Sequence, residues 1–279
     1  MKKTCLLIVG LFYAAFIYAN VDTVYIFSKA MQKDIKTVVI KPSNYKKKKN
    51  SSYPVVYLLH GAMGVSTNWI RKVPQLQEMA DEHQLIIVCP DGSVNSWYFD
   101  SPVDSSYRYE THVGTEVPEY IDANYNTIAN RNFRAITGLS MGGHGAMFIA
   151  LRHPQTFSAC GSMSGALAVN LITRGYDMQK RLGDTITNRK YYEDWSVLKV
   201  MESYQPKDSI SIIVDCGLND FIYSMSKAAH EKLIQLKIPH DYIERPGKHD
   251  WFYWANAVRY QLLFFKEHFK RKKRYLSAS

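Results

Sequence analysis

The chain has 279 residues, carries a formal net charge of +10, and is 46% hydrophobic. This composition supports one large buried core, and α/β folds of this length commonly form a single domain. The positive charge is concentrated in two runs, Lys46 to Lys49 and Lys270 to Arg274. Neither run has interleaved aromatic residues or a binding motif. We therefore interpret them as a polar loop and a frayed C-terminus, and we expect no nucleic-acid binding.

The first residues are typical of a secretory signal peptide. Lys2 and Lys3 form a short basic start, Cys5 to Tyr18 is almost wholly apolar, and Ala19 offers a small residue for cleavage. The apolar run is too short to span a bilayer comfortably, so we expect no stable membrane span after cleavage, with an uncleaved interfacial anchor as the alternative. Residues 1–19 are thus predicted to direct the domain of residues 20–279 to a secreted or periplasmic location.

Three cysteines remain after this cleavage, namely Cys89, Cys160 and Cys216, and each ends or follows an apolar run. Their odd number and the lack of a C-x-x-C spacing argue against a disulfide framework and against a zinc site. We expect them to be small buried hydrophobic residues, with at most one bridge among them. We expect neither a metal site nor a cofactor.

The order of apolar runs along the chain predicts alternating strands and helices. Partly alternating patterns predict an antiparallel pair of strands over 21–27 and 35–40. Apolar runs predict buried strands over 54–59 and 85–88. Further strands are predicted over 133–137, 157–163, 210–215 and 241–244. Helical spacing or position predicts helices over 73–83, 109–124, 141–152, 221–236 and 251–270. The alternation indicates a mostly parallel sheet of about eight strands with helices on both faces.

The segment around Ser140 is the most informative motif. A short apolar run leads into G-x-S-x-G, from Gly138 to Gly142, and small residues continue into the next helix at Gly143 and Gly145. This pattern is typical of a nucleophile elbow, a strand, sharp turn and helix that presents a serine hydroxyl. We therefore predict that Ser140 is a nucleophile.

A serine nucleophile needs a base that accepts its proton, and the base should follow the last strand. His249 lies in a turn directly after the predicted strand 241–244 and before the final helix, so we assign it as the base. His240 is a rival, but it precedes that strand and would lie at the opposite edge of the sheet. His144 lies one helical turn beyond Ser140, where we expect it to pack on the helix.

The base needs an acid that orients it, and the acid should follow the preceding strand. Asp220 lies beyond a glycine turn after the strand 210–215, from where its carboxylate reaches back toward His249. Asp215 is the alternative, although it is nearer the strand and suits a buried structural role. The resulting order of Ser140, Asp220 and His249 matches that of α/β-hydrolases.

An oxyanion hole should combine the backbone amide after the nucleophile with one from the loop after the third strand. Met141 supplies the first amide. The second loop follows an apolar strand and reads His60-Gly61-Ala62, where Gly61 allows a tight turn and Ala62 is the best donor. The four parts at four expected strand ends support one another.

These residues resemble the esterase D family of α/β-hydrolases, which includes S-formylglutathione hydrolases, tributyrin-type esterases, feruloyl and acetyl-xylan esterases, and mycolyltransferases. The resemblance covers about residues 21–268, and its matching stretches are 53–61, 97–102, 138–146, 216–221 and 247–251. It implies an α/β-hydrolase fold, a triad of Ser140, Asp220 and His249, and oxyanion donors at Ala62 and Met141. The signal peptide departs from the cytosolic formylglutathione hydrolases.

The segment of residues 166–207 contains no clear buried strand, which interrupts the alternation. A long excursion between core strands is usually functional or disordered. We expect it to form a small helical cap beside the active site.

Aromatic residues near the predicted site suggest a substrate class. Trp97 and Tyr98 lie in the loop after the fourth strand and Trp251 follows His249, so we assign these three to substrate binding. The alternative is that they fill the core and shield the site. With export and the resemblance, they favour short acyl or feruloyl esters, carried on a small ester or an acylated polysaccharide.

Three other functions are consistent with the residues. One is acyl transfer to a sugar or lipid, a second is an S-formylglutathione hydrolase-like thioesterase, and a third is a catalytically idle carbohydrate-binding protein. The complete set of Ser140, Asp220 and His249 argues against the idle protein. The sequence does not indicate an oligomeric state.

Overall fold

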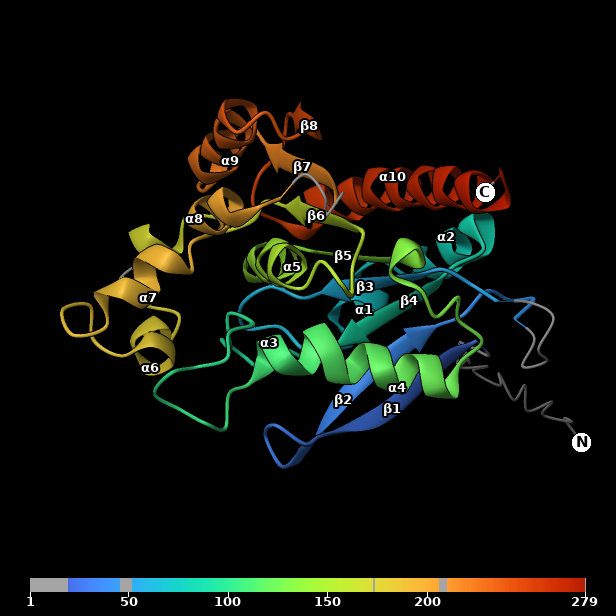
Figure 1. Ribbon diagram of the computed structural model, residues 1–279, viewed down its shortest axis with the longest axis horizontal. Helices are drawn as coiled ribbons and strands as arrows, with labels where there is room; N and C mark the ends of the chain where they lie inside the picture. Colours follow the sequence, from blue (N-terminus) through green and yellow to red (C-terminus); the bar gives the residue numbers. More distant parts are fainter. Residues whose placement is uncertain (1–19, 46–51, 173, 206–209, 279) are drawn as a thin grey trace, which may run out of the picture.

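The computed structural model describes residues 20–45, 52–172, 174–205 and 210–278 (Figure 1). Within these residues, eight strands form one sheet in the order β1-β2-β4-β3-β5-β6-β7-β8. The predicted signal peptide and the basic run of residues 46–49 lie outside the described residues.

The sheet is mostly parallel, which confirms the predicted fold class. The antiparallel part comprises β1 (Val21–Ser28) and β2 (Lys33–Ile40), and β2 also pairs antiparallel with β4 (Ile86–Pro90). All other neighbouring strands are parallel. These strands are β3 (Val55–Leu59), β5 (Arg134–Gly138), β6 (Ala159–Met163), β7 (Ser211–Gly217) and β8 (His240–Arg245).

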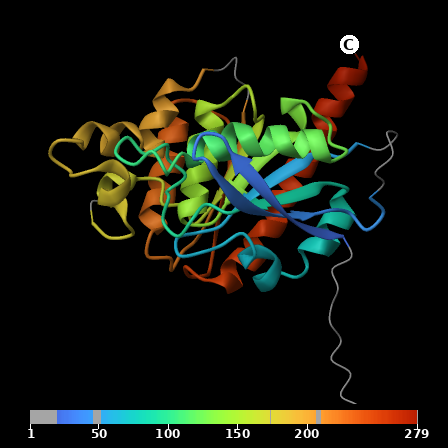
Figure 2. The ribbon, with the colours of Figure 1, turned by 90° about the horizontal axis from the view of Figure 1, so that it is seen from below.

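Helices cover both faces of the sheet, as Figures 1 and 2 show. Alternate residues of β3 enter two separate hydrophobic clusters, because successive side chains in a strand point to opposite faces. Val55 and Tyr57 join the cluster that contains α5 (Met141–Arg152), α4 (Val117–Asn124) and α9 (Tyr223–Gln235). Val56 and Leu58 join the cluster that contains α2 (Leu76–His83) and α10 (Trp251–Ala278).

Three predicted helices differ from those observed. The helix predicted over 73–83 begins only at Leu76, as α2, and a separate short helix that was not predicted, α1 (Asn68–Lys72), precedes it. Pro74 lies between the two helices and disfavours helical backbone at the residue before it. The helix predicted over 109–124 contains a π-helical turn, η1 (His112–Glu116), between α3 (Tyr109–Thr111) and α4. The C-terminal run predicted to be frayed is helical, since α10 continues to Ala278.

Within the segment of residues 166–207, the described residues, 166–172 and 174–205, fold into short helices at one end of the molecule (Figure 1). Buried Tyr192 and Val197 join its helices to the larger core cluster. These elements are η3 (Val169–Leu171), α6 (Met178–Leu182), α7 (Arg189–Asp194), α8 (Val197–Val200) and η4 (Met201–Ser203). Outside this segment, a short 3-10 helix, η2 (Arg131–Phe133), precedes β5.

The three cysteines of the domain are free and buried, as expected for small hydrophobic residues. They lie on three different strands, with Cys89 on β4, Cys160 on β6 and Cys216 on β7. Burial raises the pKa of the Cys160 and Cys216 thiols to about 12, so these thiols stay protonated and unreactive at neutral pH.

Tyr57 offers a test of this core. Its side chain is fully buried against Phe157, and none of the described residues hydrogen-bonds its hydroxyl. Because an unpaired buried hydroxyl costs on the order of 1–3 kcal/mol, we expect Tyr57→Phe to raise the free energy of unfolding by about 1 kcal/mol in urea denaturation.

The matched control is Tyr98→Phe. Tyr98 is equally buried, but its hydroxyl donates to the His60 carbonyl at 3.0 Å, so this variant should lose stability. Equal losses in the two variants would show that the Tyr57 hydroxyl has a partner.

Candidate active site

Ser140 occupies a strained turn between β5 and α5. Its backbone has φ +53° and ψ −119°, a conformation that non-glycine residues rarely adopt. The backbone around it is crowded: a Cβ on Gly142 would lie 2.5 Å from the His60 carbonyl oxygen, and one on Gly138 would lie 2.5 Å from that of Gly142. Glycines at these positions let the turn close and leave the Ser140 hydroxyl at the N-terminal end of α5.

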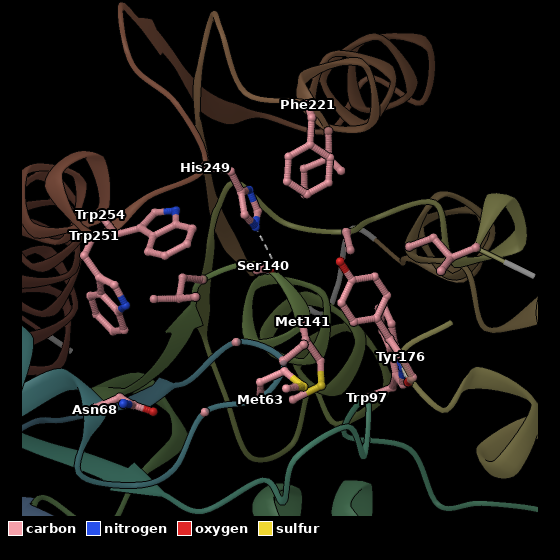
Figure 3. Close-up of a pocket in the computed structure, with 17 residues that line it drawn as sticks. Met63, Asn68, Trp97, Ser140, Met141, Tyr176, Phe221, His249, Trp251 and Trp254 are labelled. Atoms are coloured by element: carbon pink, nitrogen blue, oxygen red, sulfur yellow. Dashed lines mark hydrogen bonds between the residues drawn. The ribbon is translucent and has the colours of Figure 1, made fainter. Parts of the chain in front are cut away.

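The three residues predicted as a triad meet at the carboxyl ends of their strands. His249 Nε2 lies 3.0 Å from Ser140 Oγ (Figure 3). On the other side of the ring, His249 Nδ1 lies 3.0 and 2.9 Å from the two carboxylate oxygens of Asp220. Asp220 follows β7, and His249 lies between β8 and α10. The arrangement forms a continuous hydrogen-bonded path from carboxylate to hydroxyl.

The surroundings of Asp220 keep it ionised. Burial alone would raise the pKa of this carboxyl, but hydrogen bonds from His249, from the Ile222 amide and from Ser164 outweigh it and lower the pKa below its usual value. The carboxylate therefore accepts a hydrogen bond from the N–H at Nδ1 of His249. This leaves the lone pair of His249 Nε2 directed at Ser140. This is the tautomer that a general base requires.

The rival residues lie elsewhere. Asp215 is fully buried and bonds Arg245 and Tyr253, while His240 Nε2 lies 2.8 Å from His230 Nδ1. His144 is buried among aromatic rings, and both of its ring nitrogens lack partners among the described residues. Burial lowers the pKa of His144 to about 3, so its imidazole is neutral.

The two predicted oxyanion donors lie in the same pocket as Ser140. Ala62 and Met141 both line it, and within the described part of the chain neither amide donates to a protein acceptor. Met141 is the first residue of α5, where amides have no partner within the helix and the helix dipole favours negative charge. The geometry therefore suits a developing oxyanion.

His60 supports the Ala62 loop, a role that sequence reasoning missed. The ring is buried, its Nδ1 lies 2.8 Å from the Gly61 carbonyl, and its Nε2 accepts the Gly92 amide at 2.8 Å. Burial lowers the pKa of His60, which keeps it neutral and able to bond both groups. The histidine of the His-Gly pair was the available signal, since a neutral imidazole can donate from one nitrogen and accept at the other.

The pocket at Ser140 has a volume of about 360 Å³ and is mainly apolar. Of the described residues, none with a formal charge lines it; the polar side chains are those of Asn68, Ser140 and His249, besides the aromatic hydroxyl and indoles. Its aromatic and methionine side chains come from loops and helix starts far apart in the sequence (Figure 3), and they are Met63, Trp97, Met141, Tyr176, Phe221, Trp251 and Trp254.

Two of the three predicted substrate-binding aromatics line this pocket, and one does not. Trp97 and Trp251 are at its wall, and the Trp97 indole donates to the Tyr176 carbonyl at 2.9 Å. The prediction for Tyr98 is wrong: this side chain is 0% exposed and is packed against Gly145 of α5. Trp97 and Tyr98 both have positive φ. Their side chains therefore leave this turn in different directions, Trp97 into the pocket wall and Tyr98 against α5.

Four further aromatic and methionine side chains of the pocket were not predicted. Phe221 and Trp254 contact the His249 ring, at centroid distances of 4.6 and 4.9 Å. Met63 and Tyr176 lie across the pocket at the rim and are 73% and 51% exposed. Phe221 and Trp254 had a signal, since each lies within five residues of a predicted triad member; Tyr176 had none.

Asp215 joins the two loops that carry Asp220 and His249. Its carboxylate accepts from Arg245 Nη2 at 2.5 Å and from the Tyr253 hydroxyl. The loops touch directly, since a Cβ on Gly217 would lie 2.5 Å from the Gly247 carbonyl oxygen. The buried ion pair therefore holds β7, β8 and the start of α10 in register beneath Asp220 and His249.

A family model described as putative esterase matches residues 28–265. Over 250 residues, the chain is 27% identical to an acetyl esterase of Caldicellulosiruptor saccharolyticus, covering 83% of this chain and 92% of that protein. It is also 27% identical to an S-formylglutathione hydrolase of Mus musculus, with 81% and 84% covered.

Solved structures share the fold. A ferulic acid esterase superposes with a TM-score of 0.76 at 28% identity, covering 89% of this chain and 98% of that one. An S-formylglutathione hydrolase of Staphylococcus aureus superposes with a TM-score of 0.77 at 19% identity, covering 88% and 98%, and supports the fold alone. The predicted α/β-hydrolase architecture is thus confirmed.

Tyr253→Phe tests the support that Asp215 gives to the loops. The variant keeps the ring against Gly247 but removes one hydrogen bond to the buried carboxylate. We expect kcat for ester hydrolysis to fall about three- to tenfold with KM changed less than about twofold, because small shifts of a base lower the rate of the chemical step.

Tyr260→Phe is the control, because it makes the same change on the same helix at a 44% exposed ring. Steady-state kinetics should leave this control at the wild-type values. A Tyr253→Phe enzyme that loses stability while keeping its kcat would contradict a positioning role.

His144→Phe tests the buried neutral imidazole. The folded pKa of about 3 lies below the ordinary value of 6.5, so the unfolded chain binds the proton first and stability falls as the pH drops from about 6.5. The loss of unfolding free energy between pH 7 and pH 5, measured by urea denaturation, should shrink by about 2 kcal/mol in the variant. An unchanged pH dependence would show that His144 titrates normally.

Proposed function

Because the chain belongs to the putative esterase family, we propose that it is an exported serine carboxylesterase that works through Ser140, His249 and Asp220 and an acyl-enzyme. The observation that carries the proposal is the path of hydrogen bonds from Asp220 through both nitrogens of His249 to Ser140 Oγ. Serine needs a base at this distance to become a nucleophile at neutral pH.

The geometry supports a two-step reaction. His249 Nε2 takes the Ser140 proton while Oγ attacks the ester carbonyl, and the Ala62 and Met141 amides donate to the resulting oxyanion. Asp220 stabilises the imidazolium, which then gives its proton to the departing alcohol. A water molecule, deprotonated by the same base, hydrolyses the acyl-enzyme and restores Ser140.

The pocket favours uncharged acyl groups. Flat aromatic side chains such as Trp97, Tyr176 and Phe221 offer faces for a phenolic acyl group, and a short acyl group also fits a volume of about 360 Å³. Glutathione carries two carboxylates, and of the described residues no lysine or arginine lines the pocket to pair with them. We therefore favour acetyl or feruloyl esters over a glutathione thioester.

Export and the cap complete the proposal. The basic and apolar pattern of residues 1–19 supports a secreted or periplasmic location, where acylated polysaccharide is a suitable substrate. Residues 166–207 supply Ile172 and Tyr176 to the pocket wall, which supports their role as a cap over the acyl group. An acetyl esterase and a ferulic acid esterase are among the similar proteins, which supports the same substrate range.

The test is a panel of esters with wild type and Ser140→Ala. The panel comprises p-nitrophenyl acetate, methyl ferulate, acetylated xylan and S-formylglutathione. We expect hydrolysis of the first three, and a loss in kcat of at least about 10⁴-fold in the variant, because the nucleophile is removed. Ser106→Ala, at an exposed serine outside the pocket, is the control and should keep full activity.

Two further readouts separate the alternatives. His249→Ala should lose a similar factor in kcat and should label slowly with a fluorophosphonate probe, since Ser140 then lacks its base. Retained ester hydrolysis in Ser140→Ala would refute the mechanism. Product analysis with a sugar acceptor present would reveal acyl transfer, and a wild type that neither hydrolyses nor labels would identify an idle binding protein.

A further inference from the structure

The C-terminal helix α10 holds a large share of the positive charge of the chain. It contains seven lysines and arginines and one glutamate, and so contributes six of the ten net positive charges. Five of these cations are consecutive, from Lys270 to Arg274. Because successive helical residues are about 100° apart, five in a row surround the helix with positive charge.

This cationic end is not neutralised by the rest of the protein. Among the described residues, Lys270 has a carboxylate 3.7 Å away on Glu267, whereas Arg271, Lys273 and Arg274 form no ion pair. Partial burial and the neighbouring Arg131 and Arg271 lower the pKa of Lys272, so like charges are held close together. A helix dipole favours a cation or two in the last turn but does not account for a run of five.

The cationic run ends in exposed apolar side chains. Tyr275 is 81% exposed and Leu276 is 53% exposed, at the last turn of a helix whose surroundings are otherwise charged. Basic residues beside an aromatic and an aliphatic residue suit the boundary between lipid headgroups and acyl chains. A soluble polyanion would use the cations and leave these two side chains in water.

The cationic end lies far from the pocket. α10 begins at Trp251 in the pocket wall, and its 28 residues extend about 42 Å at 1.5 Å per residue. Figure 2 shows its C-terminal turns reaching beyond the body of the molecule.

We propose that the last two turns of α10 dock the exported enzyme on an anionic phospholipid surface. Lys270 to Arg274 pair with lipid phosphates, and Tyr275 and Leu276 enter the headgroup region. The pocket then faces away from the lipid and stays open to substrate. The proposal goes beyond the proposed function and depends on none of its chemistry, only on export.

The experiment measures vesicle binding by the processed chain from Asn20 onward, which contains every described strand and helix. Sedimentation is compared between vesicles of phosphatidylglycerol with phosphatidylcholine and vesicles of phosphatidylcholine alone. We expect at least about tenfold stronger partitioning to the anionic vesicles, weakening as salt rises. Glutamine replacements at Lys270, Arg271, Lys273 and Arg274 should abolish this preference.

The control variant removes four exposed cations elsewhere, by glutamine replacement at Lys29, Lys72, Lys227 and Lys237, and should keep the anionic preference. Hydrolysis of p-nitrophenyl acetate should be equal in both quadruple variants, which separates this proposal from the catalytic one. Equal loss of vesicle binding in the two variants would overturn the proposal, because net charge alone would then explain it.

The apolar tip provides the second test. Tyr275→Ala combined with Leu276→Ala should weaken vesicle binding about threefold or more and leave binding to heparin, a soluble polyanion, unchanged. Tighter binding to heparin than to anionic vesicles, with no effect of the two alanines, would assign the cationic end to a soluble acidic polymer and overturn docking on lipid.

Discussion

Close backbone packing beneath Ser140 is the constraint on which the site depends. The turn after β5, the start of α5 and the loop after β3 approach so closely that Gly138 and Gly142 leave no room for a Cβ. This contact fixes three things at once: the strained serine, the Met141 amide at the head of the helix and the loop that carries Ala62. Ser140 and the two amides that we propose as oxyanion donors are thereby positioned by backbone, which is more rigid than side chains.

The positions of Asp220 and His249 depend on a second close contact between backbone segments. The loops after β7 and β8 touch at Gly217 and Gly247, and Asp215 bonds Arg245 and Tyr253 directly beneath them. A buried ion pair contributes little net stability but is costly to break. We therefore infer that the pair of Asp215 and Arg245 serves to hold the two loops in one geometry. The site thus rests on two places where glycines let backbone segments touch. The imidazole of His249 connects them through its hydrogen bond to Ser140.

Much of this could be predicted from the sequence because strand order and turn chemistry are local signals. Ser140, Asp220 and His249 each follow an apolar run and a glycine turn, and parallel pairing brings such ends together. What failed was the direction of side chains. Trp97 and Tyr98 are neighbours in a turn with two positive φ values, and no periodicity reveals that one lines the pocket while the other supports His60.

The lack of charge in the pocket has a kinetic consequence. Within the described part of the chain, no ionised side chain lines the cavity, although the protein as a whole is strongly cationic. Electrostatic steering acts on charged ligands, so a neutral ester meets this pocket at an ordinary diffusional rate. Capture of substrate then depends on the release of water from exposed rims such as Met63 and Phe221. Turnover of neutral esters is thereby decoupled from ionic strength.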